Sequence, residues 1–374
     1  MNVTYRFIEP LDVLFLRGNK LFGDPGSHGE SLVPPWPSVA AGALRSLMLA
    51  VDGVDIAAFA RGAHAHPTLG TPARPGSFAL TGFDLARRDV NGGVETLHAL
   101  PADLALTRDE DDKLVLNRLQ PQSPAAGLAS SAPLAQWPVL AQARRGKSIG
   151  SFWLRQAAWA AYLAGGVPVM GDLVSAAELW KLDARVGVGL DTARRRAEDG
   201  KLFTAQAVAF ARNVGFLATI RGAEPPQGGM LRFGGDGRGA AMQAVEHAQP
   251  DPDWDALARA RRLRIVLTTP GLFPQGWLLP GVDAEWRLKL DGIGGRLVCA
   301  AVPRAEVVSG WDLALKQPKP AERVAPIGSI YWIDDLGATP EQLRKLADRG
   351  LWAEAGHNAA RQAEGFNRFA LAPF

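Results

Sequence analysis

The chain has 374 residues, of which 47% are hydrophobic and 21% charged, so it can bury a core large enough for two domains and is not intrinsically disordered. Its single cysteine, Cys299, excludes a disulfide framework and a zinc site built on several thiolates. The formal net charge of +3 and the pI of about 9.1 fit an anionic partner, although an alanine- and arginine-rich chain is also what a GC-rich genome encodes.

The beginning of the chain has neither the basic region nor the apolar region of a signal peptide. The most apolar stretch, residues 149–166, is short for a membrane span and carries Arg155 and Gln156 near its middle. We therefore expect a cytoplasmic protein without a membrane-spanning segment.

The N-terminal sequence predicts a strand, a glycine-rich loop and a helix, in that order. Residues 3–8 alternate in hydrophobicity, and LVPPWPSVAAGALRSLML occupies residues 32–49 after the loop. The three prolines prevent a helix from beginning before them, so Ser38 is the expected N-cap. Gly42 in the helix interior indicates close packing by another element, and Arg45 is expected on the face opposite the apolar one.

The middle of the chain predicts a hairpin, a long loop and a core helix. Apolar runs at residues 103–107 and 113–117 flank an acidic turn and are typical of paired strands. Residues 121–148 are rich in Pro, Ala and Ser, which predicts a surface loop with Lys147 near its end. Residues 151–166 are apolar nearly all round and predict a buried helix.

Arginine is concentrated in the second half of the chain. Residues 187–210 predict a hairpin whose loop carries three consecutive arginines, Arg194, Arg195 and Arg196. A charge run on a loop is usually just solvated, so this cluster decides nothing alone. Basic groups on several separate loops nevertheless favour an extended polymer over a small ligand.

Catalytic and metal-binding motifs are sparse. The histidines are scattered, and His64 and His66 have no third ligand at a useful spacing. The sequence has no nucleophile elbow and no His-Glu-x-x-His motif. His28, in the glycine-rich loop, is the one histidine placed for chemistry, but a surface residue is the simpler interpretation. We predict no metal, no cofactor and no catalytic residue.

The densest glycine stretch is FGGDGRGAAM, residues 233–242. A nucleoside-triphosphate loop needs a lysine and a hydroxyl after its last glycine, and two alanines stand there instead. A dinucleotide fingerprint needs a βαβ unit, whereas the surrounding pattern favours a hairpin. Two interpretations stay open: a loop that brings backbone amides to phosphates beside Arg232 and Arg238, or a plain tight turn.

Seven segments in a fixed order carry a family resemblance: IEPLDVLFLRGNKLFG, LVPPWPSVAAGALRSLML, GVGLDTARRRAEDGKLFTAQAVAF, RFGGDGRG, LTTPGLFPQGW, SGWDL and APIGSIYWID. Together they resemble a RAMP-superfamily subunit of type III-B CRISPR (Cmr) effector complexes, the subunit found at the 5′ end of the crRNA. The resemblance runs from residue 7 to about residue 335. The glycine-rich ending of the family is blurred here, and only Gly356 and Gly365 match it loosely.

The resemblance implies an α+β fold of two ferredoxin-like (RRM-like) RAMP modules with extended loop insertions, residues 1–180 and 181–374. It implies a non-catalytic scaffold that holds the repeat-derived 5′ handle of the crRNA. Its expected protein partners are the large palm-domain (polymerase/cyclase-like) subunit and the backbone RAMP subunit, and it would meet target RNA indirectly. An open sheet face and its loops suit single-stranded RNA.

The expected RNA-binding residues lie in these motifs and on the basic loops: Arg17, His28, Ser38, Arg45, Lys147, Arg194, Arg195, Arg196, Arg232, Gly234, Gly235, Gly237 and Arg238. The first amides of the helix beyond Ser38 would form an anion site for an RNA phosphate or a partner carboxylate.

Two alternatives remain. The first is a metal-independent RAMP endoribonuclease that processes precursor crRNA, using His28 with Lys20 or Arg17. The second is a nucleotide-binding enzyme built on the GGDGRG sequence.

Overall fold

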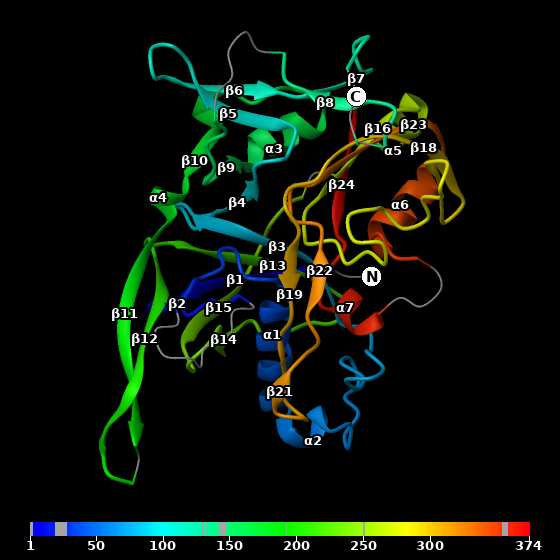
Figure 1. The fold of residues 1–374 in the computed structure, drawn as a ribbon. Coiled ribbons are helices and arrows are strands. Elements are labelled where there is room, and N and C mark those ends of the chain that lie inside the picture. Colours follow the sequence, from blue (N-terminus) through cyan, green and yellow to red (C-terminus); the bar gives the residue numbers. More distant parts are fainter. Residues whose placement is uncertain are drawn as a thin grey trace. The chain divides into compact units, whose positions relative to one another are not determined.

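The computed structural model describes residues 3–18, 28–128, 131, 133–141, 147–191, 193–249, 251–353 and 358–374. The chain has the expected mixed α+β architecture, with mostly antiparallel strands and few helices (Figure 1). It divides into two compact units: unit 1 is Met1–Val94, Ala177–Glu246 and Val307–Glu322, and unit 2 is Glu95–Ala176, His247–Glu306 and Arg323–Phe374.

Each unit is therefore assembled from three stretches of chain. The boundary expected between residues 180 and 181 lies near one crossing, at Ala177, but the chain crosses between the units at other places too. Where independently folding modules begin and end stays a prediction.

Unit 1 is built on five antiparallel strands in the order β3 (Ala79–Arg88), β13 (Val214–Arg221), β1 (Val3–Pro10), β15 (Gly239–Val245) and β14 (Gly228–Arg232). Across the sheet the order is β3, β13, β1, β15. Along the chain these are the second, third, first and fourth of the four strands, which is the ferredoxin-like arrangement. Helix α1 (Pro37–Val51) makes the first crossover and packs on β3 and β14. The β14–β15 hairpin stands where the fold would have its second helix.

Helix α1 starts differently from the prediction. Trp36, not Ser38, is the N-cap residue, it gives no side-chain hydrogen bond to the helix, and Pro37 is the first helical residue. Proline suits that position because its fixed φ is helical and the N–H it lacks would have no helical acceptor. The close packing expected at Gly42 is also wrong, since this residue is exposed and a Cβ there would have no atom within 4 Å.

Unit 2 is built on a second antiparallel sheet, in the order β17 (Arg287–Leu290), β18 (Ile293–Ala301), β23 (Ile330–Gly337), β16 (Leu263–Leu267) and β24 (Phe369–Pro373). Strands β16, β18, β23 and β24 repeat the ferredoxin-like order, with α6 (Pro340–Arg349) between the last two.

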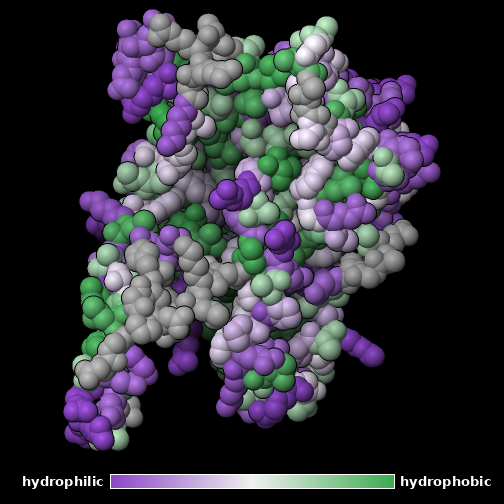
Figure 2. Space-filling model, viewed as in Figure 1, coloured by the Kyte–Doolittle hydropathy of each residue, from purple (hydrophilic) through white to green (hydrophobic). Residues whose placement is uncertain are grey.

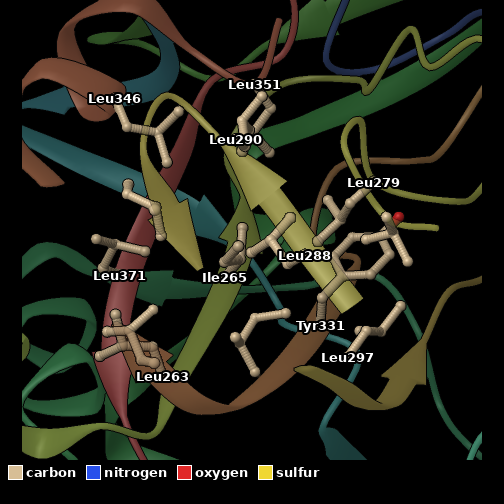
Figure 3. Close-up of a cluster of buried hydrophobic side chains, with 14 of the residues drawn as sticks. Leu263, Ile265, Leu279, Leu288, Leu290, Leu297, Tyr331, Leu346, Leu351 and Leu371 are labelled. Atoms are coloured by element: carbon tan, nitrogen blue, oxygen red, sulfur yellow. The ribbon is translucent and has the colours of Figure 1, made fainter. Parts of the chain in front are cut away.

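The central strands of this sheet are buried on both faces. Neighbouring residues of a strand point to opposite faces. Leu263 and Ile265 contact the leucine-rich cluster shown in Figure 3, whereas Val266 packs with Tyr162 and Trp332 on the other face. Only the edge strand β17 alternates between buried and exposed residues, so the centre of the sheet offers no surface on which RNA bases could stack.

Several elements of unit 2 lie outside this sheet. The predicted pair of strands is confirmed as β5 (Leu104–Arg108) and β6 (Leu114–Arg118). The helix expected over residues 151–166 is shorter: Phe152–Arg155 forms strand β9, and α3 covers only Gln156–Leu163.

The remaining elements are short or belong to hairpins: β2 (His28–Gly29), α2 (Ile56–Ala60), β4 (Val94–Ala99), β7 (Gln120–Gln122), β8 (Trp137–Val139), η1 (Met170–Asp172), β10 (Leu173–Ser175), α4 (Ala176–Leu179), β11 (Trp180–Asp191), β12 (Arg196–Phe210), α5 (Trp254–Ala260), β19 (Glu306–Val308), β20 (Trp311–Asp312), β21 (Gln317–Pro318), β22 (Glu322–Val324) and α7 (Ala359–Ala363). Within the described ranges, none of the helices is long and apolar enough to span a bilayer.

Candidate nucleic-acid interface

The β11–β12 hairpin of unit 1 places the three consecutive arginines at its tip, as predicted (Figure 1). Arg194, Arg195 and Arg196 are all exposed. The Nε of Arg194 lies 3.8 Å from Oδ2 of Asp191, a distance at the limit of an ion pair. The side chains of Arg195 and Arg196 form no hydrogen bond or ion pair with the part of the chain that the structure describes, so their guanidinium groups are available to a ligand.

The stem of this hairpin has one aliphatic face. Leu182, Val186 and Val188 alternate along β11 and are exposed, and Leu202 lies opposite Val188 on β12. Hydrophobic residues follow this stem in Figure 2, and hydrophilic ones gather at its tip. On the opposite face the Phe203 ring covers its cross-strand partner, glycine 187, where a Cβ would collide with it.

The inner half of the hairpin is held by two N-terminal segments. Leu14 pairs with Val208 through two backbone hydrogen bonds, with N–O distances of 2.9 and 2.8 Å. Strand β2 pairs in parallel with β12, which brings the backbone of His28 beside Thr204. Arg17 lies in a bridge with Ser31. Arg17 and the His28 backbone thus lie at the base of the hairpin that carries the three arginines.

The GGDGRG sequence forms the turn between β14 and β15. The amide of Gly235 donates to the Phe15 carbonyl at 2.8 Å. Gly234 has a φ of +79°, and a Cβ on it would lie 2.8 Å from the same carbonyl oxygen, so glycine is required for both the turn and the close approach. Gly237, with a φ of +66°, is required for the turn alone. The Gly235 amide is therefore engaged by the Phe15 carbonyl, which gives this glycine a structural role, and a contact of the loop with phosphate stays a prediction.

This turn brings two predicted arginines to the N-terminal segment. Arg17 Nη2 lies 3.0 Å from Asp236 Oδ1, and Arg238 Nη1 lies 2.9 Å from Asp12 Oδ2. The Arg238 guanidinium also lies 5.2 Å from the centroid of the Phe15 ring. The Arg17–Asp236 pair is exposed, and such pairs contribute about 0–1 kcal/mol, so a phosphate can compete for Arg17, whereas the Arg238 side chain is only 30% exposed and packs on Phe15.

The other predicted residues lie apart from this group. The Arg45 guanidinium sits 5.2 Å from the centroid of the Phe78 ring and is half-buried, which assigns it a packing contact. Ser38 is half-buried in the first turn of α1. Arg232 is exposed at the end of β14, and Lys147 is exposed in unit 2. Lys20 lies outside the described residues.

A buried charge cluster in unit 2 was missed. Asp103 accepts hydrogen bonds from Arg264 Nη1 and from the Tyr162 hydroxyl, both at 2.7 Å, and Arg118 Nε lies 3.4 Å from the same carboxylate. Asp103, Arg264 and Tyr162 are almost completely buried. Burial, helped by the neighbouring Asp103 carboxylate, raises the pKa of Tyr162 far above its ordinary value. Because it is closed to solvent, the cluster supports the core rather than a ligand.

The predicted histidines and the other possible ligands were also compared with the geometry of a metal site. Across the described ranges, no group of three His, Cys, Asp or Glu side chains is placed to hold a metal ion. The pair His64 and His66 does not converge on one ion either, because His66 Nε2 bonds to Asp52 at 2.7 Å while its Nδ1 accepts the amides of Thr68 and Leu69, each at 3.2 Å.

Comparison with known proteins identifies the family. The family model described as CRISPR-associated protein (Cas_Cmr3) matches residues 6–371. A chain in the "Cryo-EM structure of the Type III-B Cmr-beta bound to cognate target RNA and AMPPnP, state 1" is similar over 99% of both chains, with a TM-score of 0.51 and 14% identity. A chain in the "Cryo-EM structure of the Type III-B Cmr-beta bound to cognate target RNA" has a TM-score of 0.49 and 14% identity, over 97% of this chain and 95% of that one.

At 14% identity the first structural similarity bears on the fold alone, and it agrees with the α+β architecture of RAMP-type modules. No curated protein matches the sequence. Because the family model spans nearly the whole chain, the protein belongs to the Cas_Cmr3 family of CRISPR-associated proteins.

Proposed function

We propose that this protein is a non-catalytic, RNA-binding scaffold subunit of a type III-B CRISPR effector complex. It holds the repeat-derived 5′ handle of the crRNA and bridges the large palm-domain subunit to the backbone RAMP subunits. Family membership supports a place in such a complex, and the solved structures of similar fold are described as Type III-B Cmr-beta bound to cognate target RNA.

The observation that carries the RNA-binding role is the β11–β12 hairpin, which has basic groups at both its tip and its base. Arg196 and Thr204 pair with Asp191 and Val186, which lie five residues apart on β11, so the hairpin rises roughly 17 Å between them at about 3.3 Å per residue. At one end the Arg195 and Arg196 side chains have no partner among the described residues, and Arg17 lies near the other end in an exposed, weak ion pair. Cations spread over that length suit the phosphates of a nucleic-acid strand better than a small ligand.

A crosslinking experiment on the assembled complex tests this role. A photoreactive amino acid replaces Arg195 at the tip, and in a second variant it replaces Arg74, an exposed arginine elsewhere in unit 1. We expect the Arg195 position to crosslink to the repeat-derived nucleotides of the guide and the Arg74 position to give no RNA crosslink. Crosslinks confined to the target-matching part of the guide, or absent at Arg195, contradict handle binding.

The endoribonuclease alternative pairs His28 with Arg17 or Lys20, and Arg17 would exchange its weak ion pair with Asp236 for the scissile phosphate. A metal-independent nuclease cuts repeat RNA in EDTA, so incubation of the purified protein with repeat RNA separates the two functions. We expect intact RNA.

The predicted anion site at the start of α1 stays a prediction. The helix has no side-chain cap, but the Trp36 carbonyl accepts the Val39 amide at 3.0 Å, so the anion site would rest on the remaining amides of the first turn. Replacing Ser38 and Arg45 together by alanine is expected to weaken guide retention, and a fully loaded, unchanged complex would contradict this part of the proposal. Arg45→Ala also removes the packing of this side chain on Phe78. The Arg45→Lys variant is the control, because it keeps a positive charge and a long aliphatic stem at this position.

A further inference from the structure

The β20–β21 hairpin displays an apolar tip that the RNA-binding role does not use. Trp311, Leu313 and Leu315 have exposed fractions of 56%, 60% and 66%. Within the described residues, the Trp311 ring makes no hydrogen bond and no aromatic contact. Three large apolar side chains on one short turn are unusual on a free surface and are typical of interaction sites.

Hydrogen bonds within the hairpin order the backbone of the tip that carries these side chains. The Asp312 carboxylate accepts the amides of Ala314 and Leu315, each at 2.9 Å, which fixes the turn from inside. Trp311 pairs with Pro318 across the two strands. Below them, the Ser309 hydroxyl donates to the Lys319 carbonyl at 2.6 Å. A pre-ordered anchor loses little conformational entropy when it docks.

Charge and side-chain type together define the occupant. Asp312 Oδ1 accepts two amides of the turn and the Asp312 side chain is half-buried, whereas Lys316 is exposed at the tip and the half-buried Lys319 follows on the other strand. The tip therefore presents aliphatic and aromatic surface with a cationic border. Leucine side chains contribute little binding energy with nucleobases, because single-stranded RNA is bound mainly by aromatic stacking and phosphate contacts. A protein pocket that is apolar inside and acidic at its rim complements this surface.

We propose that the tip of the β20–β21 hairpin, Trp311 with Leu313 and Leu315, is a docking peg that inserts into an apolar, acidic-rimmed pocket of another protein subunit of the same complex. This inference rests on the proposed place of the chain in a type III-B complex. It assigns a protein contact to a segment outside the RNA-binding hairpin, so each can fail without the other.

The test uses the assembled, guide-loaded complex and a photoreactive amino acid at Leu313. The matched control carries the same group at Val90, which is 98% exposed and also lies in a turn fixed by an aspartate, with Asp89 Oδ1 accepting the amides of Asn91 and Gly93 at 2.8 and 2.9 Å. We expect the Leu313 position to crosslink to one protein subunit other than this chain, and the Val90 position to give at least about 10-fold less of that product.

A substitution series tests whether the contact is needed for assembly. Replacing Trp311, Leu313 and Leu315 by serine is expected to lower recovery of the crosslinked subunit at least about 10-fold, while Val90→Ser leaves it unchanged. A Leu313 crosslink to RNA, to a second copy of this chain or to nothing overturns the inference.

Protection of the guide's 5′ handle, measured on the same samples, separates the two proposals. A protected handle without the Leu313 crosslink overturns only the docking peg. The crosslink without a protected handle overturns only the RNA-binding role. Failure of the wild-type chain to enter the complex overturns both.

Discussion

Arginine plays opposite parts in the two units. In unit 2, Arg264 is buried and donates to Asp103 at 2.7 Å, with its guanidinium 4.6 Å from the centroid of the Tyr162 ring. In unit 1, Arg195 and Arg196 stand exposed at a hairpin tip. A buried cation must be paired or it destabilises the fold, whereas an unpaired exposed one is stabilised by water and is free to meet a phosphate. Burial, and not the number of arginines, separates the two roles.

Removing the carboxylate of the buried cluster should give the largest effect on stability. We expect Asp103→Ala to lower the free energy of unfolding by about 3–5 kcal/mol, because it leaves Arg264 and Arg118 uncompensated in the core. Denaturant unfolding measures the change. Asp111→Ala, which removes an exposed carboxylate from the nearby β5–β6 turn, is the control and should shift stability by less than about 1 kcal/mol.

The accessibility of the Cys299 thiol gives an independent measure of how far Asp103→Ala destabilises this core. It packs in the core cluster that contains Tyr162, and burial raises its pKa to about 12. At pH 8 the native thiol is therefore protonated and shielded, and alkylation should require unfolding. We expect Asp103→Ala to increase the alkylation rate at least about 10-fold under native conditions, and equal rates in the two proteins would contradict a core role for the cluster.

Removing only the hydroxyl of the cluster should give a smaller loss. Tyr162→Phe keeps the ring beneath Arg264 but removes the donor to Asp103, and we expect a loss of about 2 kcal/mol, as for a hydrogen bond to a charged group. Thermal unfolding in parallel with Asp103→Ala checks the order. A loss as large as that of Asp103→Ala would show that the hydroxyl, not the paired charges, dominates.

The hairpin tip should respond in binding and not in stability. Replacing Arg194, Arg195 and Arg196 by alanine should shift the unfolding free energy by no more than about 0.5 kcal/mol. If all three contact single-stranded RNA phosphates, the slope of log affinity against log salt concentration should fall in magnitude by about 2. RNA titrations of the wild-type and the variant complex over a range of salt concentrations measure this slope. An unchanged slope would show that the tip is not part of the RNA interface.

The exposed ion pair at the base of the hairpin should give the smallest effect. Arg17→Ala is expected to change stability by at most about 1 kcal/mol, because the Arg17–Asp236 pair is exposed. Asp236→Asn removes the ion pair with the arginine and should strengthen RNA binding modestly, in the opposite direction from Arg17→Ala. Equal effects of both variants on RNA affinity would mean that the pair acts only through the fold.

Local signals predicted several elements correctly. The strand at the N-terminus, the β5–β6 pair and the arginine-tipped hairpin all follow from alternation and turn residues. The glycine-rich turn was left open between two interpretations, and its glycines are explained by close contact with the Phe15 carbonyl. Sequence spacing alone could not show this contact, because the two segments are far apart along the chain.

The errors have two causes. Ser38 was predicted as the helix cap from its position after the prolines, whereas Pro37 already fits the first helical position. The buried role of Arg264 was missed because its partner Asp103 is 161 residues away. Burial of a charge depends on such distant pairing, which no local pattern reports.

The central claim is that this subunit holds the 5′ handle of the guide RNA. The most direct measurement is purification of the tagged, full-length chain from its native host, followed by end-mapping of the bound RNA and identification of the bound proteins. The claim predicts recovery of partner subunits together with guides that share one repeat-derived 5′ end. Recovery of the chain alone, with repeat RNA newly cut in EDTA, would contradict it and establish the endoribonuclease.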